Sequence, residues 1–416
     1  MTQNQKSSES GSIGRNIALI VGSNILTKTG DALANPKTVL TWMLGAVGTP
    51  DSLIGMLVPI RESGSMLPQV YLSRWVRSRP YRKGVWVLGS LIQGAAILGI
   101  AAAGWFLTGL LAGLVVVALL GVFSVARSLC SITSKDVLGK TVPKEKRGRV
   151  TGLSASLSNL VVMGVGILLI LFQESENSHL YFSGLVCLAG FCWVIAAGVY
   201  RTIAEPSGEV DKGETTEKFF DRLRLLIRER AFLRFVIARA CLLSTALSAP
   251  YYVRIVQESS EGGLHWLGIF ILAQGLAVGI SGIFWGRLSD RSSRLSMVYG
   301  GALASLLGFV VGGFAAISPE SLLLPWIGVA GFFLLGIAHN GVRVGRKTYV
   351  VNLGEGNRRT EYVAVSNTLI GILLLIAGSL GALSSFLGPG GILIVLAIGG
   401  MMGALLSARL PDVEGH

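Results

Sequence analysis

Ionisable side chains interrupt long apolar stretches of this sequence at a few positions, and they are its strongest candidates for chemistry. Lys28 and Asp31 lie three residues apart, so a helix would place them on one face and let them pair. Arg61 and Glu62 are adjacent in a second apolar stretch. A poorly hydrated carboxylate with a basic neighbour can switch protonation, so Asp31 or Glu62 could carry a coupled proton. The alternative is two permanent ion pairs, Lys28 with Asp31 and Arg61 with Glu62, that only tie helices together.

Other polar groups extend this set, and basic residues outnumber acidic ones in it. Arg239 lies inside an apolar stretch, and Gln93 and Gln274 add amide groups to two others. An excess of guanidinium and ammonium groups would suit an anionic ligand. Further polar residues stand toward the ends of apolar stretches: Arg127, Arg254, His339, Asn340 and Arg343. We interpret the three arginines of this last set as long side chains that reach toward water at the membrane edges.

The composition indicates which elements must position these groups. Of 416 residues, 51% are hydrophobic and only 14% charged, and the mean hydropathy is +0.63. With roughly 20 apolar residues per membrane-spanning helix, the chain has room for about twelve such helices and for no sizeable soluble domain. The predicted spans are residues 17–46, 53–75, 85–106, 107–134, 153–172, 180–200, 232–253, 264–285, 295–317, 322–344, 362–387 and 391–410.

The basic residues alternate between successive connections, which predicts the orientation in the membrane. The connections after even-numbered spans carry several Lys or Arg residues each, whereas the loops 48–51, 173–179, 257–263, 318–321 and 388–390 carry none. Because cytoplasmic loops collect Lys and Arg, both termini should face the cytoplasm of a cell-membrane protein. The net charge of +13 then reflects topology, and we expect no nucleic-acid partner.

The chain divides into two similar halves. Ala32 to Pro36 match Ala246 to Pro250 at an offset near half the chain length, and other short matches follow in the same order. We therefore predict two six-helix bundles with a central loop, whose residues 217–235 form an amphipathic cationic helix on the inner leaflet. The expected regions are an N-terminal tail (1–14), the first bundle (15–200), the central loop (201–231), the second bundle (232–410) and a C-terminal tail (411–416).

One connection in the second half carries a recognisable motif. The run Gly286-Arg287-Leu288-Ser289-Asp290-Arg291-Ser292-Ser293-Arg294 resembles the Gly-x-x-x-Asp-Arg-x-x-Arg signature of the major facilitator superfamily of secondary transporters. The first-half copy, residues 73–79, departs from the signature, with Ser73 in place of the Gly and Arg77 in place of the Asp. The Gly-Pro signature of drug/proton antiporters is missing from the fifth predicted span.

The resemblance implies a cytoplasmic latch between the halves. Asp290 and Arg291 would hold it, with Gly286 allowing two backbones to approach closely and Asp290 facing a helix N-terminus. Charged residues at the ends of the fourth and tenth spans would meet there and act as a gate. The full predicted gate is Gly286, Asp290, Arg291, Arg294, Lys135, Asp136, Arg346 and Lys347. The alternative for the gate charges is ordinary solvation in loops.

Small residues spaced four apart predict helix packing in lipid. The pairs are Gly275 with Gly279, Gly282 with Gly286, and Gly308 with Gly312. The four cysteines lie in apolar stretches and the four histidines are scattered, so no disulfide framework, metal site or cofactor is expected. No nucleophile and base lie in a pattern typical of an enzyme.

These observations predict an all-α membrane protein of twelve helices in two pseudo-symmetric bundles. We expect a monomer that moves a small solute by alternating access, coupled to protons. The residues expected along the substrate and proton pathway are Lys28, Asp31, Arg61, Glu62, Gln93, Arg239 and Gln274. Asp31→Asn and Arg61→Ala should then each abolish transport while leaving folding and membrane insertion intact. The alternatives are a non-transporting sensor on the same fold and a lipid flippase.

Overall fold

A computed structural model describes residues 3–69, 72, 75, 76, 78–171, 178–208, 210, 229–260, 263–354 and 357–414, and within these ranges it is helical, with no strand. The first half contains α1 (Gln3–Leu33), α2 (Val39–Ala46), α3 (Asp51–Met66), α5 (Lys83–Phe106), α6 (Gly109–Thr141), α7 (Lys144–Leu171) and α8 (Ser178–Arg201). The second contains α10 (Arg230–Cys241), α11 (Ser244–Leu247), α12 (Ala249–Ser259), α13 (Leu264–Arg291), α14 (Ser293–Ile317), α15 (Leu324–Leu353), α16 (Asn357–Gly378), the 3-10 helix η1 (Ser379–Leu383) and α17 (Ser384–Ala408).

These helices correspond to the twelve predicted spans. By length and composition, nine helical stretches among the described residues could cross a membrane. One of them, residues 365–408, contains two spans, because Gly388 adopts φ 65° and Pro389 follows it, which turns the chain back. The remaining two are α1 with α2, and α3; α2 and α3 have only 8 and 16 residues, and α1 is polar over much of its length.

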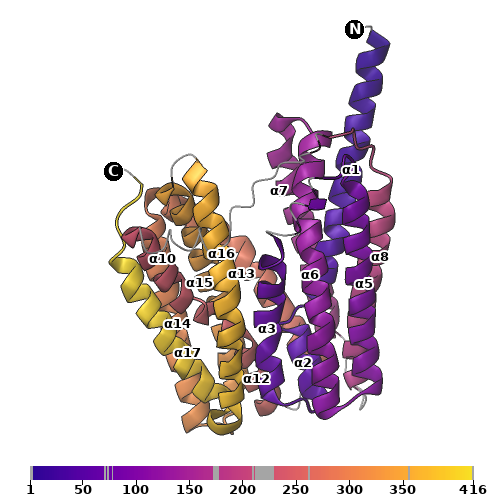
Figure 1. Ribbon diagram of the computed structural model, residues 1–416. Helices are drawn as coiled ribbons and strands as arrows, with labels where there is room; N and C mark the ends of the chain where they lie inside the picture. Colours follow the sequence, from indigo (N-terminus) through magenta and orange to yellow (C-terminus); the bar gives the residue numbers. More distant parts are fainter. Residues whose placement is uncertain are drawn as a thin grey trace.

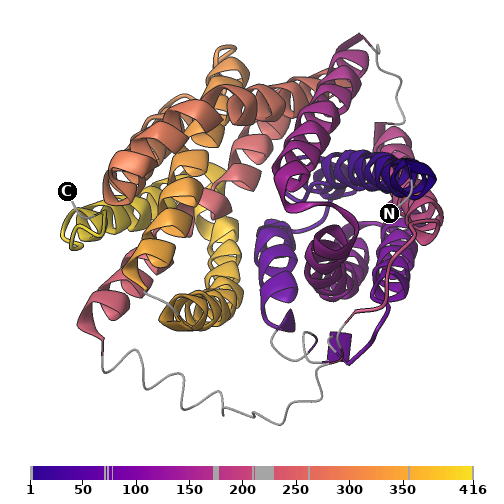
Figure 2. The same cartoon turned by 90° about the horizontal axis from the view of Figure 1, so that it is seen from above.

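The two halves form separate bundles with the same internal arrangement (Figures 1 and 2). In the first bundle α5 packs between α8 and α6, and in the second α14 packs between α17 and α15. Glycines bring these helices together: Gly94 of α5 faces Gly190 of α8, and Gly312 of α14 faces Gly390 of α17. This agrees with the predicted two-half repeat. Most of the central loop, including residues 217–228 of the predicted amphipathic helix, lies outside the described residues, as do Ser73, Arg74 and Arg77 of the first-half motif copy.

The predicted small-residue pairs differ in what they contact. A Cβ at Gly308 would meet Ala397 of α17 at 2.9 Å, and one at Gly275 would meet Met163 of α7 at 2.8 Å, so both glycines permit close packing. Gly282 and Gly286, in contrast, have no atom of the described residues within 4 Å of an added Cβ. The packing role predicted for this last pair is therefore wrong in this conformation, because their side of α13 is not covered by another helix.

Breaks in the first helix of each half position the residues near the centre. Between α1 and α2 the Asn35 carbonyl accepts hydrogen bonds from the backbone N–H groups of Thr38 and Leu40, while its side-chain Oδ1 accepts one from the Lys37 N–H at 2.8 Å. Pro36, within this break, has no N–H to donate. The matching segment of the second half, Ala246 to Pro250, is also interrupted: α10, α11 and α12 stand there in place of one continuous helix. Each break turns side chains toward the space between the bundles.

Both chain termini lie at one end of the molecule, which we call the terminal face; the other end is the opposite face (Figure 1). The bundles meet where α7 crosses α13 and where α3 crosses α16 and η1. Toward the opposite face the contact is backbone to backbone: a Cβ on Gly268 of α13 would stand 2.6 Å from the Gly166 carbonyl oxygen of α7. Toward the terminal face the helices of the two bundles diverge (Figure 1).

Candidate functional site

A cavity of about 310 Å³ lies between the two bundles. The first bundle contributes three lining residues, and the second bundle contributes the rest from α11, α12, α13, α15, α16 and the segments between them. The lining residues are Lys37, Glu62, Met66, Leu243, Thr245, Ala246, Ala249, Gln274, Val278, Phe332, Leu335, Gly336, His339, Asn340, Arg343, Arg346, Lys347 and Leu374. The cavity therefore combines an apolar part with a strongly charged part.

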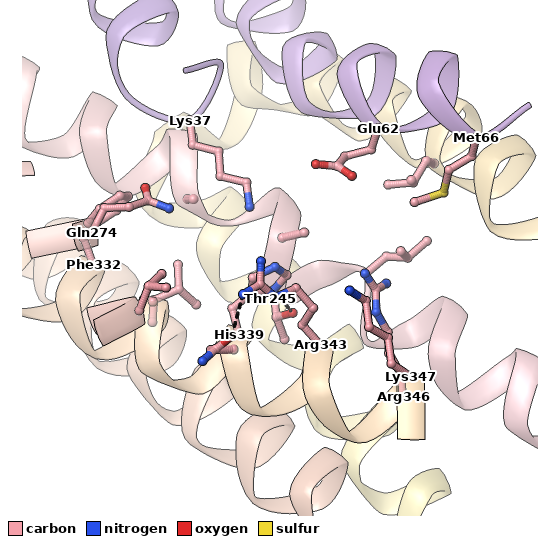
Figure 3. A pocket seen from close by; sticks show the side chains of 18 residues that line it. Lys37, Glu62, Met66, Thr245, Gln274, Phe332, His339, Arg343, Arg346 and Lys347 are labelled. Carbon is pink, nitrogen blue, oxygen red and sulfur yellow. Dashed lines mark hydrogen bonds between the residues drawn. The ribbon is translucent and has the colours of Figure 1, made fainter. Parts of the chain in front are cut away.

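The charged part is a stripe along α15. His339, Arg343, Arg346 and Lys347 are spaced by four, three and one residues, which places them on one side of a helix. Lys37 and Glu62 project into the cavity from the first bundle (Figure 3). With His339 neutral, the four cations and the one carboxylate among the described lining residues sum to a formal charge of +3.

Hydrogen bonds hold one part of this stripe in place. The Arg343 Nη2 donates to the Asn340 Oδ1 at 2.8 Å, and the Asn340 Nδ2 donates to the Ser281 Oγ of α13 at 2.9 Å. His339 Nδ1 and Thr245 Oγ1 lie 3.0 Å apart and share a hydrogen bond (Figure 3). A cation preorganised in this way loses less freedom when it binds a ligand.

Other polar side chains that line the cavity have no bonding partner among the described residues. Within the described ranges, the side chains of Lys37, Glu62, Arg346 and Lys347 form no hydrogen bond or ion pair, and the buried Oε1 of Gln274 accepts none. Glu62 is near enough to Lys37 and Arg346 to interact with both electrostatically. Charged and amide groups of this kind are free to bind a polar solute or water.

Asp31 belongs to a separate ion cluster inside the first bundle. Its Oδ1 accepts from the Arg61 Nη2 at 2.8 Å and from the Arg127 Nη1 at 2.5 Å, and its Oδ2 accepts from the Arg127 Nη2 at 2.7 Å. The Arg61 guanidinium also stacks over the Phe123 ring at 4.4 Å. The predicted pairs Lys28–Asp31 and Arg61–Glu62 are therefore wrong, as is the interpretation that Arg127 reaches to the membrane edge. Two guanidinium groups on α3 and α6 compete for Asp31 more effectively than exposed Lys28 on its own helix.

Three further residues of the predicted pathway do not line the cavity. Gln93 is buried between α5 and α6, where its Nε2 donates to Gly89 O and Cys130 Sγ. Arg239 is buried between α10 and α16 and donates to Ser366 Oγ and Asn367 Oδ1, each at 2.8 Å. Lys28 is exposed on α1. Of the predicted pathway residues, only Glu62 and Gln274 lie on the cavity.

The predicted gate charges are not joined across the bundles in this conformation. Asp136 pairs with Arg82 and with Lys140, both in its own bundle. Asp290 is exposed and forms no ion pair within the described part of the chain, and the cap of α14 comes from Ser292 Oγ, which accepts from the Leu295 N–H. Arg294 donates to the Leu410 carbonyl of the C-terminal segment. The expected close approach at Gly286 is also absent among described residues.

An ion pair does join the bundles at the opposite face. The Arg254 Nε of α12 donates to the Asp51 Oδ1 of α3 at 2.7 Å, and Gln257 Nε2 donates to the Trp42 carbonyl of α2 at 2.9 Å. The interpretation of Arg254 as a side chain that only reaches toward water is therefore wrong, because it bridges the two halves. The bundles are closed at the opposite face, and the described residues form no contact that would engage the terminal-face latch predicted from the signature.

The glycine contact at the opposite face gives a first testable prediction. Gly268→Val should shift the protein away from this closed arrangement, because the added side chain would meet the Gly166 carbonyl oxygen and the Ile170 nitrogen at 2.6 and 2.8 Å. Spin labels on Phe106→Cys and Leu322→Cys, both exposed, would report the separation of the bundles at that face in a background free of native cysteines. We expect longer distances in Gly268→Val and unchanged ones in Gly282→Val; an unchanged distribution in a folded Gly268→Val protein would contradict the assigned closure.

Sequence reasoning missed Lys37 and gave too little weight to Arg343. Lys37 directly follows Asn35-Pro36, a local signal for a helix break, and a lysine at such a break inside a span is a candidate for a cavity. Arg343 was set aside as an edge residue because its depth was judged from distance along the chain. Its position three residues after Asn340 on the same helix face was the available signal.

Comparisons with known proteins agree with this architecture. The sequence profile of the Major Facilitator Superfamily matches residues 22–324, so the chain belongs to this superfamily. None of the curated proteins compared with the chain matches it in sequence. Three solved structures illustrate the shared fold. A POT family transporter in complex with 5-aminolevulinic acid has a TM-score of 0.74 and 11% identity, with 94% of this chain and 95% of that chain covered.

The other two structures cover slightly more of this chain. A D-xylose-proton symporter has a TM-score of 0.65 and 12% identity, with 97% of this chain and 98% of that chain covered. A bacterial homologue of the iron transporter ferroportin, in an inward-facing state, has a TM-score of 0.64 and 19% identity, with 97% of this chain and 99% of that chain covered. Together with the family match, these similarities identify a multi-pass membrane protein of the transporter class.

Proposed function

We propose that this protein is a secondary active transporter that moves a small organic anion by alternating access, coupled to protons. The observation that carries the proposal is the cavity between the bundles, with Lys37, Arg343, Arg346 and Lys347 on its surface and Glu62 as the only carboxylate among its described lining residues. Membership of the superfamily supports a transporter of small solutes. Similar structures include one that holds 5-aminolevulinic acid and one named as a proton symporter.

The charge balance favours an anion over a cation. Guanidinium and ammonium groups removed from bulk water are stabilised by carboxylates or phosphates, which arginine binds through two parallel hydrogen bonds. A cationic solute would face four positive groups and one negative group in the same space, and like charges at short range in a medium of low dielectric repel strongly. The same charges argue against a lipid flippase, which would need an apolar groove.

Glu62 is the proton carrier that this arrangement supports, in preference to Asp31. Asp31 is held by two arginines inside the first bundle and does not line the cavity. Glu62 lies on the cavity without a fixed partner among the described residues, beside the cations that an anion would occupy. A proton on Glu62 and an anion on those cations would then occupy the same cavity, which is the arrangement that coupled transport requires.

The orientation follows from the distribution of basic residues. If the terminal face is cytoplasmic, as the connection charges predict, the structure is closed to the outside and open toward the inside. The Asp51–Arg254 pair would then be an outer gate that breaks when the transporter opens outward. Asp290 and Arg291 would form the inner latch only in that other state.

Removal of a fixed cation should test the proposal directly. Purified protein should be stabilised by a pool of small carboxylates and phosphate monoesters, since a ligand at 100 times its dissociation constant adds about 2.7 kcal/mol to the free energy of unfolding. Arg343→Gln should lose this thermal shift, and Arg287→Gln, which removes an exposed arginine on α13, should keep it. Stabilisation by quaternary ammonium compounds instead, or a normal anion response in Arg343→Gln, would refute the anion assignment.

A further inference from the structure

We infer that the transported anion carries two negative charges on an apolar body, with one charge on the α15 stripe and the second on Lys37. This inference rests on the proposed function and specifies its substrate class. Three features of the cavity support it: the number of cations without an ion-pair partner among the described residues, their division between the two bundles, and the apolar lining.

The number of cations exceeds what a singly charged anion can balance. Within the described residues, Glu62 is the one carboxylate that lines the cavity, against Lys37, Arg343, Arg346 and Lys347. Among the described residues, the charged neighbours of Lys347 are also basic: Arg343, Arg346, Lys135 and Arg239. With Glu62 ionised, a monoanion would leave a charge of +2 in the cavity and a dianion +1. Because the cations that remain attract a further negative charge at short range, the second negative charge should strengthen binding.

The cations come from two separate bodies. Arg343, Arg346 and Lys347 all belong to α15, whereas Lys37 approaches from the break between α1 and α2 in the first bundle (Figure 3). Its backbone N–H is held by Asn35 Oδ1, but its ammonium group has no hydrogen-bonding or ion-pair partner in the described ranges. An anion held on α15 can therefore present its second charge to Lys37. Such a ligand would tie the two bundles together across the cavity.

The apolar surface and the size limit the rest of the ligand. Apolar side chains also line the cavity: Leu243, Ala246, Val278, Phe332, Leu335 and Leu374. A volume of about 310 Å³ is at the lower end of the range for small-molecule sites, roughly 300–1,000 Å³. The cavity therefore suits a short aliphatic or single-ring body.

Matched probes can separate the second charge from the body that carries it. Succinate and butyrate share a four-carbon chain, and phenyl phosphate and benzoate share a phenyl ring; the first of each pair is largely doubly charged at neutral pH or slightly above. Dissociation constants would be measured by titration calorimetry on the purified full-length protein and on Lys37→Gln, Arg343→Gln and Lys28→Gln. Lys28→Gln is the matched control, because it removes an exposed lysine of α1 that does not line the cavity.

We expect at least one doubly charged probe to bind ten or more times more tightly than its singly charged partner. Lys37→Gln should abolish most of that difference in affinity and leave the affinity for the monoanion unchanged. Arg343→Gln should weaken the binding of both probes, and Lys28→Gln should weaken the binding of neither. If only succinate binds more tightly than its partner, the ligand carries its charges at two ends. If only phenyl phosphate does so, the ligand carries one doubly charged group.

Two other outcomes overturn different claims. Equal binding of mono- and dianions, with both lost in Arg343→Gln, would overturn the inference and leave the proposed anion transport standing. The inference would also be overturned, and the anion proposal would also stand, if Lys37→Gln kept the full ratio of dianion to monoanion affinity. Absence of binding by all four probes to a protein that unfolds at its normal temperature would count against the anion proposal itself.

Discussion

Glu62→Gln is expected to abolish accumulation of the anion against its gradient while leaving its exchange across the membrane intact. For one proton per anion, a gradient of two pH units supplies about 2.7 kcal/mol, enough for roughly a hundredfold concentration ratio. A glutamine of the same shape cannot take up the proton, so this ratio should fall to about one. Exchange of internal for external anion needs no net proton movement and should persist, because Lys37, Arg343 and Arg346 remain in the cavity.

The measurement is uptake into proteoliposomes with the membrane potential clamped at zero and a pH gradient imposed in either direction. The probe is the anion that stabilises the purified protein most. Glu320→Gln serves as the control, since Glu320 is an exposed carboxylate in the connection between α14 and α15. Gradient-driven accumulation by Glu62→Gln at the wild-type level would exclude Glu62 as the proton carrier.

Asp31→Asn is expected to destabilise the protein strongly. The substitution leaves Arg61 and Arg127 without the carboxylate that both of them bind, and Arg61 is only 11% exposed. Removing one partner of a buried pair costs roughly 3–5 kcal/mol; because Asp31 is 23% and Arg127 35% exposed, we expect about 2–4 kcal/mol. This differs from the expectation drawn from the sequence, in which insertion and folding were unaffected.

Unfolding of the purified variant by heat or by added denaturing detergent would measure the effect. Lys28→Gln, three residues away and exposed, should leave the unfolding midpoint nearly unchanged. A double-mutant cycle with Arg127→Gln should show a coupling energy between Asp31 and Arg127, because the guanidinium contacts both carboxylate oxygens. A wild-type midpoint in Asp31→Asn would mean that the ion cluster adds nothing to stability.

Several features of the fold could be predicted because their signals are local in the sequence. Apolar length identifies a span, and Pro36 and Gly388 mark interruptions, since each acts on its own stretch of backbone. Likewise, Gly308 and Gly312 face α17 as their spacing on α14 predicts. The same spacing at Gly282 and Gly286 was misleading, because a repeat of small residues does not reveal whether a partner helix covers it in a given state.

The ionic contacts were predicted less well, for a physical reason. Sequence spacing identifies only neighbours on the same helix, such as Lys28 for Asp31, or adjacent residues such as Arg61 and Glu62. In the folded protein, Asp31 is within reach of guanidinium groups on α3 and α6, and it binds these in preference to Lys28. That choice depends on how three helices pack and on how well each cation is hydrated.

The sequence by itself determined the class of molecule: a membrane protein of two six-helix halves with an excess of basic residues in its interior. Those properties arise from hydropathy and charge along the chain, and they do not depend on how the halves meet. Only the tertiary structure decided that Lys37 and Glu62 face Arg343, Arg346 and Lys347 across one cavity, while Gln93 and Arg239 are buried elsewhere. The reason is that a cavity between two bundles is made by side chains far apart in the chain, and their meeting depends on helix breaks, helix rotation and the conformation of the transporter.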